Sequence, residues 1–364
     1  MAEVLKSFLP LVRLGVGHPA GDLPETLDWD ALEALANAQG LSAIVLDGAQ
    51  ALSDRGELAG GRAMDVQKKK MWIGAVIRNY EQKYADYRKR IGQLAAFYHR
   101  HGFELMVLKG YGLSLNYPVP SHRPYGDIDI WAFGRYKEAD AVLSKELGIR
   151  VDDSHHHHTV FRFKGYTVEN HYDFVNVHYG HRNADLEKIF KSLASDASWT
   201  ADIDGERICL PAPDLNALFL LRHMMLHFAS TELNVRQILD WGFFVEKYAA
   251  RVDWKWLQEV LDQYHMADFA ACMNAICTED LGFDAALFPV LRADASLKDR
   301  ILEDTLSPEF SEPEPARSGL FPRVAFKYRR WRANAWKQDL CYGDNRLLAF
   351  LVSAWSHLIK PSMI

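Results

Sequence analysis

The chain has few cysteines, no long hydrophobic run and no large excess of either charge. Its four cysteines, spread over 364 residues, form no C-x-x-C pair, which excludes a disulfide scaffold and a zinc module of known spacing. The longest apolar stretches, such as 347–355, are far shorter than the roughly 20 residues that span a bilayer, so we expect no membrane partner. A formal net charge of −6 excludes a strongly basic protein whose whole surface follows nucleic acid.

The N-terminus also lacks the apolar core and the small-residue cleavage site of a secretory signal. Scattered thiols fit a reducing compartment, and we therefore expect a cytoplasmic protein. What is present is ordinary for a folded chain, with 49% hydrophobic and 25% charged residues. The length corresponds to roughly two to three domains.

The spacing of apolar residues divides the chain into three regions. Residues 1–102 are predicted to be helical, and an apolar stripe from Ile77 to Tyr98 predicts a helix packed on the body of the protein, with a dimeric coiled coil as the alternative. Residues 103–208 mix strand and helix patterns, and residues 209–364 return to helical periodicity. We therefore predict an α+β protein with a small mixed β-sheet core between helical N-terminal and C-terminal segments.

Short apolar or alternating runs predict the strands of the middle region. They are a buried strand over 103–108, an alternating strand over 127–132, and a hairpin of 159–163 and 166–172 that turns at Lys164-Gly165. A helix is expected over 136–147, closed by Gly148.

Carboxylates on two of these strands predict a metal site. Asp127 and Asp129 alternate with isoleucines, so both face the same side of one strand, about 6.6 Å apart at about 3.3 Å per residue. Glu169 lies on the more polar face of another strand. Three such carboxylates can hold two Mg²⁺ ions, with Mn²⁺ as an alternative, because hard cations offset their repulsion. A solvated edge strand is the alternative for the paired aspartates alone.

The order of several segments resembles a bacterial family of uncharacterised nucleotidyltransferases within the DNA polymerase β-like superfamily. The segments are VLKG at 107–110, LNYP at 115–118, RPYGDIDI at 123–130, VENH at 168–171, LPAPDLNALFLLRHMMLHF at 210–228 and RQILDW at 236–241. The resemblance covers most of the chain. It implies a nucleotidyltransferase core, activity on a nucleoside triphosphate and dependence on divalent metal.

The resemblance also implies roles for single residues. Asp127 and Asp129 would bind or bridge both ions, and Glu169 would complete the site of the ion that activates the acceptor. Lys109-Gly110 replaces the superfamily's usual Gly-Ser turn. Gly110 permits close backbone approach to phosphate, Lys109 adds a point charge, and Arg123 would contact phosphate or support the site.

Other polar residues are candidates from their positions alone. His171 shares the strand face of Glu169 and could orient a carboxylate or contact substrate. Asp240 lies four residues after Arg236, so a helix-surface ion pair and a contact to nucleotide or acceptor are both open. The run His155–His158 fits a loop, a contribution to the active site or a transition-metal site. His223 and His227 are expected to serve helix packing, because position 224 is Met rather than the Glu of a zinc protease.

We therefore predict a Mg²⁺-dependent transfer of a nucleoside monophosphate from a nucleoside triphosphate to a hydroxyl of an acceptor: a small molecule, a protein or an RNA end. The alternative is a non-catalytic or regulatory relative that binds a nucleotide or small molecule. Residues 321–338 carry six basic side chains interleaved with aromatic ones, which is typical either of nucleic-acid binding or of a basic helix packed on the core.

Overall fold

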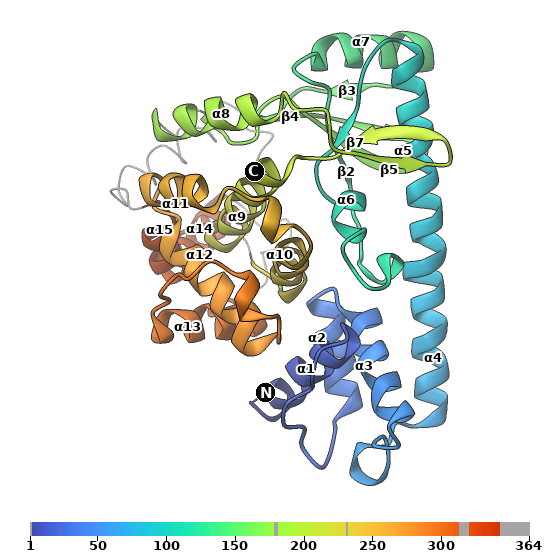
Figure 1. Ribbon diagram of the computed structural model, residues 1–364, viewed down its shortest axis with the longest axis vertical. Helices are drawn as coiled ribbons and strands as arrows, with labels where there is room; N and C mark the ends of the chain where they lie inside the picture. The colour runs from blue at the N-terminus through green and yellow to red at the C-terminus, as the bar shows by residue number, and fades with distance from the viewer. Residues whose placement is uncertain (1, 178–180, 231, 313–319, 343–364) are drawn as a thin grey trace.

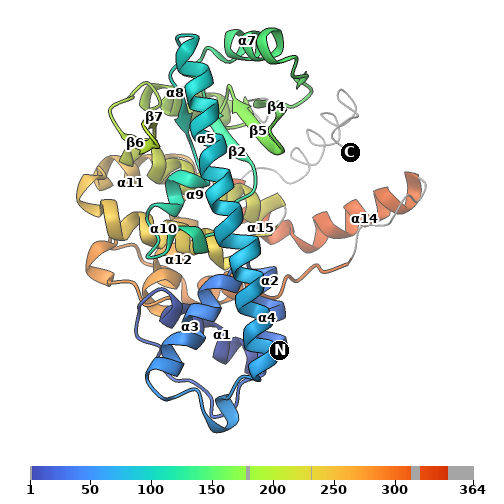
Figure 2. The ribbon, with the colours of Figure 1, turned by 90° about the vertical axis from the view of Figure 1, so that its right-hand side faces the viewer.

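The computed structural model describes residues 2–177, 181–230, 232–312 and 320–342. The N-terminal region is helical, as predicted. Three short helices are followed by a long one that runs along one side of the molecule (Figures 1 and 2). The elements are α1 (Ala2–Gly15), α2 (Trp29–Ala38), α3 (Ser42–Asp54), α4 (Val66–Val76), a π-helical turn (Ile77–Glu81) and α5 (Gln82–Arg100).

The predicted apolar stripe is fully buried only in its second half, although Tyr80 and Tyr84 pack against the core as partly buried side chains. From Tyr87 onward its residues are fully buried, whereas Ile77 is 39% exposed. The π-helical turn begins at Ile77, and a π turn holds one residue more than an α turn. Ile77 and Tyr80 lie within this turn, so they are rotated relative to the residues of α5 that follow.

The middle region forms the predicted mixed sheet, which has seven strands in the order β3-β4-β5-β2-β1-β7-β6. Strand β2 pairs in parallel with β5 and antiparallel with β1, and β4 and β5 form the predicted hairpin. The strands are β1 (Met106–Val107), β2 (Ile128–Trp131), β3 (Val151–Asp152), β4 (His158–Phe163), β5 (Tyr166–His171), β6 (Thr200–Ile203) and β7 (Glu206–Cys209). Strand β1 is shorter than the predicted run over 103–108.

The two faces of this sheet bury different cores. Ile128 and Ile130 belong to a cluster with α5 and with α7 (Tyr136–Leu147), which ends at Gly148 as expected. On the opposite face Trp131 contacts Phe174, and Phe174 contacts Phe219 of α9 (Pro213–Ser230). Asp129 and Glu169 share the face of Trp131, because strand side chains alternate. The carboxylate face therefore looks toward the C-terminal helices.

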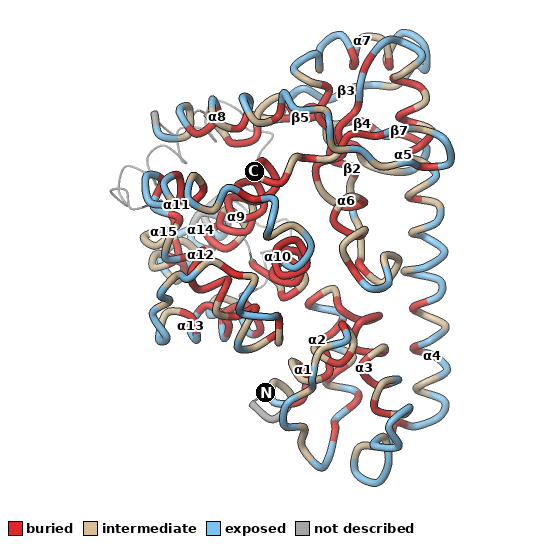
Figure 3. The backbone as a smooth tube through the Cα atoms, in the orientation of Figure 1, coloured by how far each residue is buried: buried red, intermediate tan, exposed pale blue. Residues whose placement is uncertain are grey.

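The C-terminal region is helical, as predicted, and its buried residues concentrate in α9 and α10 (Figure 3). Helix α10 begins with a capping box between Asn234 and Gln237. The remaining elements are α6 (Tyr111–Ser114), α8 (His181–Leu193), α10 (Val235–Tyr248), α11 (Trp254–Gln263), α12 (Ala267–Ala275), α13 (Ala295–Leu306), α14 (Leu320–Ala333) and α15 (Ala335–Tyr342). The end of the predicted region 209–364, residues 343–364, lies outside the described residues.

No helix in the described ranges combines the length and the apolarity needed to cross a bilayer.

Candidate active site

The site lies on three adjacent strands whose register brings its residues together. Asp129 of β2 is opposite Glu169 of β5, and His171 of β5 is opposite His158 of β4. Lys109 enters from the turn that follows β1. The structure therefore brings together five of the predicted site residues: Lys109, Asp127, Asp129, Glu169 and His171.

Asp129 is the most enclosed of these carboxylates, with only 2% of its surface exposed. Its Oδ1 lies 2.8 Å from Lys109 Nζ and 3.0 Å from His171 Nε2. Burial opposes ionisation, but the charge of Lys109 and the contact with His171 outweigh it and hold the pKa of Asp129 well below its usual value. Asp129 is therefore a carboxylate anion at neutral pH.

Glu169, in contrast to Asp129, retains its proton at neutral pH. Burial, and after it the negative charges of Asp129 and Asp127, raise the pKa of Glu169 to about 8. Its Oε2 lies 3.7 Å from His171 Nε2, and single ligand atoms of Asp129, Glu169 and His171 all lie within 4.8 Å of one another. A group of carboxylates that resists full ionisation is suited to a divalent cation, which would offset the repulsion.

The turn Lys109-Gly110 requires glycine for two reasons. Gly110 has φ +57°, in the left-handed region that side chains disfavour. A Cβ placed there would also lie 2.3 Å from Tyr87 Oη, which donates to the backbone oxygen of Asp127 at 3.0 Å. Tyr87 thereby ties the turn to the start of β2, and the glycine leaves room for it.

Arg123, predicted to contact phosphate or to support the site, and Asp240, a candidate for a substrate contact or a helix-surface ion pair, bind each other. Arg123 Nε and Nη2 donate to the two oxygens of Asp240 at 2.7 and 2.8 Å, and Tyr117 Oη donates to Oδ1 at 2.7 Å. Arg123 and Asp240 are each 4% exposed. The pair fastens the segment before β2 to α10, and the suggested surface pair of Asp240 with Arg236 is replaced by this buried one.

Four further residues border the site; sequence reasoning did not place three of them there, and it left a contact to nucleotide or acceptor open for Arg236. Phe219, His223 and His227 form one stripe of α9, with Lys109 Nζ 5.9 Å from the Phe219 ring centroid and adjacent His223 and His227 rings 4.4 Å apart. Burial, and then the charge of Lys109, lower the pKa of both histidines. The spacing of four between these three residues was the available signal.

Arg236 of α10 is the fourth. The negative charges of Asp240 and Asp127 favour its protonated form, yet no carboxylate of the described chain lies within 4 Å of its guanidinium. Burial lowers its pKa. It is a half-buried cation near the carboxylates that lacks an ion-pair partner among the residues described.

The histidine run lies against the same site. The rings of His157 and His158 lie 5.7 and 5.2 Å from that of His171, between centroids. Burial, followed by neighbouring imidazoles, lowers the pKa of His157 to about 3 and of His158 to about 2, so both are neutral at physiological pH. Of the three roles considered for the histidine run, the geometry therefore favours a contribution to the active site.

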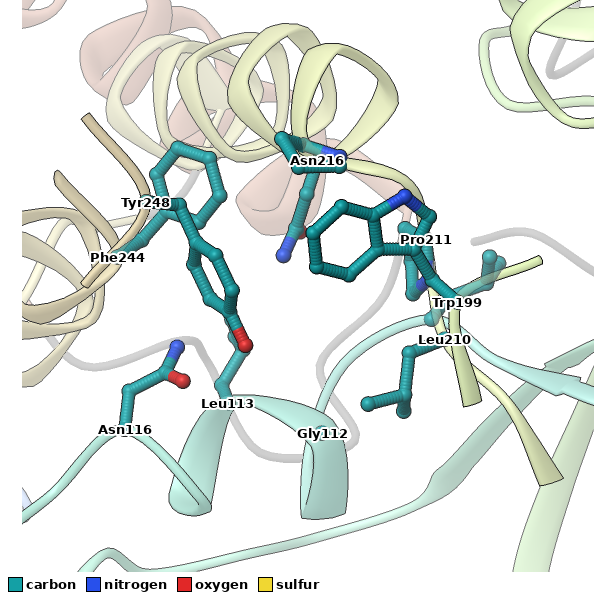
Figure 4. A pocket seen from close by; sticks show the side chains of 11 residues that line it. Gly112, Leu113, Asn116, Trp199, Leu210, Pro211, Asn216, Phe244 and Tyr248 are labelled. Atoms are coloured by element: carbon teal, nitrogen blue, oxygen red, sulfur yellow. The ribbon is translucent and has the colours of Figure 1, made fainter. Parts of the chain in front are cut away.

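A separate small pocket, open to solvent, lies beside the Lys109-Gly110 turn (Figure 4). Leu108 and Gly112, which flank the turn, line it together with the aromatic side chains of Trp199, Phe244 and Tyr248. Figure 4 shows Asn216 of α9 directed into it. No carboxylate is among its lining residues, so it adjoins the acidic site without being part of it.

The basic segment 321–338 packs on the protein in α15, whereas the described side chains of α14 are mostly exposed. Lys337 is 1% exposed and pairs with Asp304, and Arg329 pairs with Glu312 at 2.8 Å. Trp336 packs on Phe228. The contacts favour a helix packed on the core for α15, whereas Lys327, Arg329 and Arg332 of α14 are exposed, so the nucleic-acid alternative stays open there. The side chains at 321, 323 and 324 lie outside the described ones.

Comparison with curated proteins and with solved structures finds no match. The family model described as "Uncharacterised nucleotidyltransferase" matches residues 25–282, which include every residue of the acidic site and more than half of the chain. The chain belongs to this nucleotidyltransferase family.

Proposed function

We propose that the protein transfers a nucleoside monophosphate from a nucleoside triphosphate to a hydroxyl of an acceptor, using two Mg²⁺ ions at Asp127, Asp129 and Glu169. One observation carries the proposal: Asp129 and Glu169 are paired directly across β2 and β5, with Asp127 close enough to raise the pKa of Glu169. Family membership supports nucleotidyl transfer in general. The identity of the metal, the number of bound ions and the class of acceptor are what we propose beyond family membership.

The residues fit a divalent cation by their chemistry. All three are oxygen donors, and burial makes their mutual repulsion costly, which shows in the raised pKa of Glu169. Bound there, the ions would neutralise phosphate charge and lower the pKa of the acceptor hydroxyl.

The chain's own cations are placed to hold the triphosphate. Lys109 is buried among the three carboxylates, and Asp129 in particular keeps its pKa raised despite burial. Its ammonium is a compact point charge suited to phosphate. Arg236 offers a planar guanidinium that can bind two phosphate oxygens at once. Both residues would orient the substrate rather than react with it.

The reaction needs no covalent intermediate on the protein. The acceptor hydroxyl releases its proton to solvent as its oxygen forms a bond to the α-phosphorus, the bond from that phosphorus to the bridging oxygen breaks, and pyrophosphate leaves in line. Catalysis then rests on positioning and on electrostatic stabilisation of the transferring group.

Calorimetry with each of the four ribonucleoside triphosphates, with and without Mg²⁺ or Mn²⁺, tests the proposal. We expect Mg²⁺-dependent binding of at least one nucleotide, loss of that binding in Asp129→Asn, and unchanged binding in the exposed control Asp262→Asn. Incubation with α-labelled nucleotides and hydroxyl acceptors of the three classes then measures transfer. Binding of no nucleotide by the wild type would refute the proposal, and metal-dependent binding without transfer to any class would favour the non-catalytic alternative.

A further inference from the structure

Three imidazoles converge where β4 begins and β5 ends. One ring nitrogen from each of His157, His158 and His171 lies within 4.8 Å of the other two. The rings of His157 and His158 are 4.3 Å apart between centroids. Convergence of ring nitrogens is what one ion with metal–nitrogen bonds of about 2.0–2.1 Å requires, and small rotations of the rings would bring these nitrogens to that separation.

The same three side chains have unsatisfied nitrogens. Within the described chain, Nδ1 of each of the three is buried without a hydrogen-bond partner. His158 is 7% exposed and His171 is 4% exposed, so water has little access to either. Buried polar atoms nearly always have a partner, and three unpaired nitrogens in one cluster indicate that a ligand completes them.

The backbone fixes the histidine loop against β5. The amide N–H groups of Tyr172 and Asp173 donate to the backbone oxygen of His157 at 3.0 and 3.1 Å, and Tyr172 Oη donates to that of His155 at 2.9 Å. The loop that carries His157 and His158 is therefore anchored directly beside His171.

His171 already makes the contact that orients a metal-binding histidine. Its Nε2 lies 3.0 Å from Asp129 Oδ1, which leaves Nδ1 for a ligand. Histidines that bind metals usually donate their second ring N–H to a carboxylate, which fixes the ring and makes the binding nitrogen more basic.

We propose that His157, His158 and His171 bind a divalent transition-metal ion that prefers imidazole nitrogen, such as Zn²⁺, at a position separate from the oxygen site of Asp127, Asp129 and Glu169. Nitrogen donors discriminate against Mg²⁺, which prefers oxygen and keeps its waters. Three protein ligands leave one tetrahedral position open. Glu169 Oε2, 3.8 Å from His158 Nδ1, is a protein atom within reach of that position.

The inference does not depend on nucleotidyl transfer, and it is tested without nucleotide. Full-length protein without a histidine tag is stripped with chelator and titrated with Zn²⁺ in the presence of excess Mg²⁺. We expect one Zn²⁺ to bind per chain. Co²⁺ added in place of Zn²⁺ should show the intense visible absorption of a four-coordinate nitrogen-bound ion. His157→Gln and His158→Gln should each weaken Zn²⁺ binding beyond the roughly 10- to 100-fold that loss of an outer partner costs. The exposed control His101→Gln should bind as the wild type does.

Two outcomes would overturn the assignment. One is an unchanged Zn²⁺ affinity in folded His157→Gln. The other is Zn²⁺ binding that excess Mg²⁺ abolishes and Glu169→Gln removes while His157→Gln retains it, which would place the ion on the carboxylates. Thermal unfolding of the metal-free variants checks the fold. If His158→Gln unfolds because that side chain is buried, the Zn²⁺ affinity of His157→Gln decides the test, since His157 is only half-buried.

Discussion

The buried pair of Arg123 and Asp240 yields the sharpest test of how the fold supports the site. Asp240 accepts two hydrogen bonds from Arg123 and one from Tyr117, and the two charged side chains are only 4% and 5% exposed. Replacement of Arg123 by alanine leaves Asp240 buried with Tyr117 as its one described partner. Removal of one member of such a pair costs about 3–5 kcal/mol. That is a large share of the roughly 5–15 kcal/mol by which a domain is stable.

A double-mutant cycle measures this pair. Urea unfolding of Arg123→Ala, Asp240→Ala and the double variant should give singles that each lose about 3–5 kcal/mol and a double that loses far less than their sum, because it leaves no unpaired charge. Lys188→Ala is the matched control: its pair with Asp185 at 2.7 Å is 77% and 58% exposed. Its loss of stability should be far smaller than that of either single variant of the buried pair, because solvent screens an exposed pair.

The cycle also separates support of the fold from contact with substrate. Single losses that add within about 0.5 kcal/mol would refute the buried pair as the explanation, because contacting residues should couple. If the pair acts only through the fold, a folded double variant retains Mg²⁺-dependent nucleotide binding. Loss of that binding in a stable double variant would restore Arg123 as a phosphate contact.

Three further predictions concern the same region. Gly110→Ala, with φ +57° and a clash with Tyr87, should lose about 1–3 kcal/mol in urea unfolding, while Gly126→Ala, with nothing within 4 Å, should not. Because the pKa of Glu169 is raised to about 8, a proton must leave before an ion binds, so the Mg²⁺ affinity measured by calorimetry should increase about 50-fold from pH 6 to pH 8. A flat profile would contradict Glu169 as a ligand. Burial raises the pKa of Glu187 to about 7, above its unfolded value, so its contribution to stability should fall by about 2.6 kcal/mol as pH rises from 4.5 to 7, and Glu187→Gln should lose about that much less than the wild type over the same range.

Local signals in the sequence were sufficient for much of the fold. The hairpin turn at Lys164-Gly165 is confirmed, with both residues at positive φ, as is the end of α7 at Gly148. The conformation of the turn and the end of the helix are each determined by a few residues that are neighbours in the sequence. Strand β1 itself is shorter than predicted, although buried Leu105 and Leu108 beside it each make one backbone hydrogen bond to a neighbouring strand.

Contacts between distant segments could not be read in the same way. Arg123 and Asp240 are 117 positions apart, and nothing in either neighbourhood identifies the partner. The stripe of Phe219, His223 and His227 looked like helix packing because only the folded sheet brings Lys109 against it. Sequence patterns state which face of an element is apolar, but they do not state which element covers it.

The hairpin that carries Glu169 and His171 should accept changes of residue type in its turn far better than changes of length. Insertion of one residue at Lys164-Gly165 would shift β5 by one position and exchange its faces. Val168 and Asn170 would then replace the two functional side chains beside Asp129, and Glu169 would enter the core under α5. Among natural or engineered variants, we therefore expect substitutions at this turn to survive and single-residue insertions to abolish the acidic site.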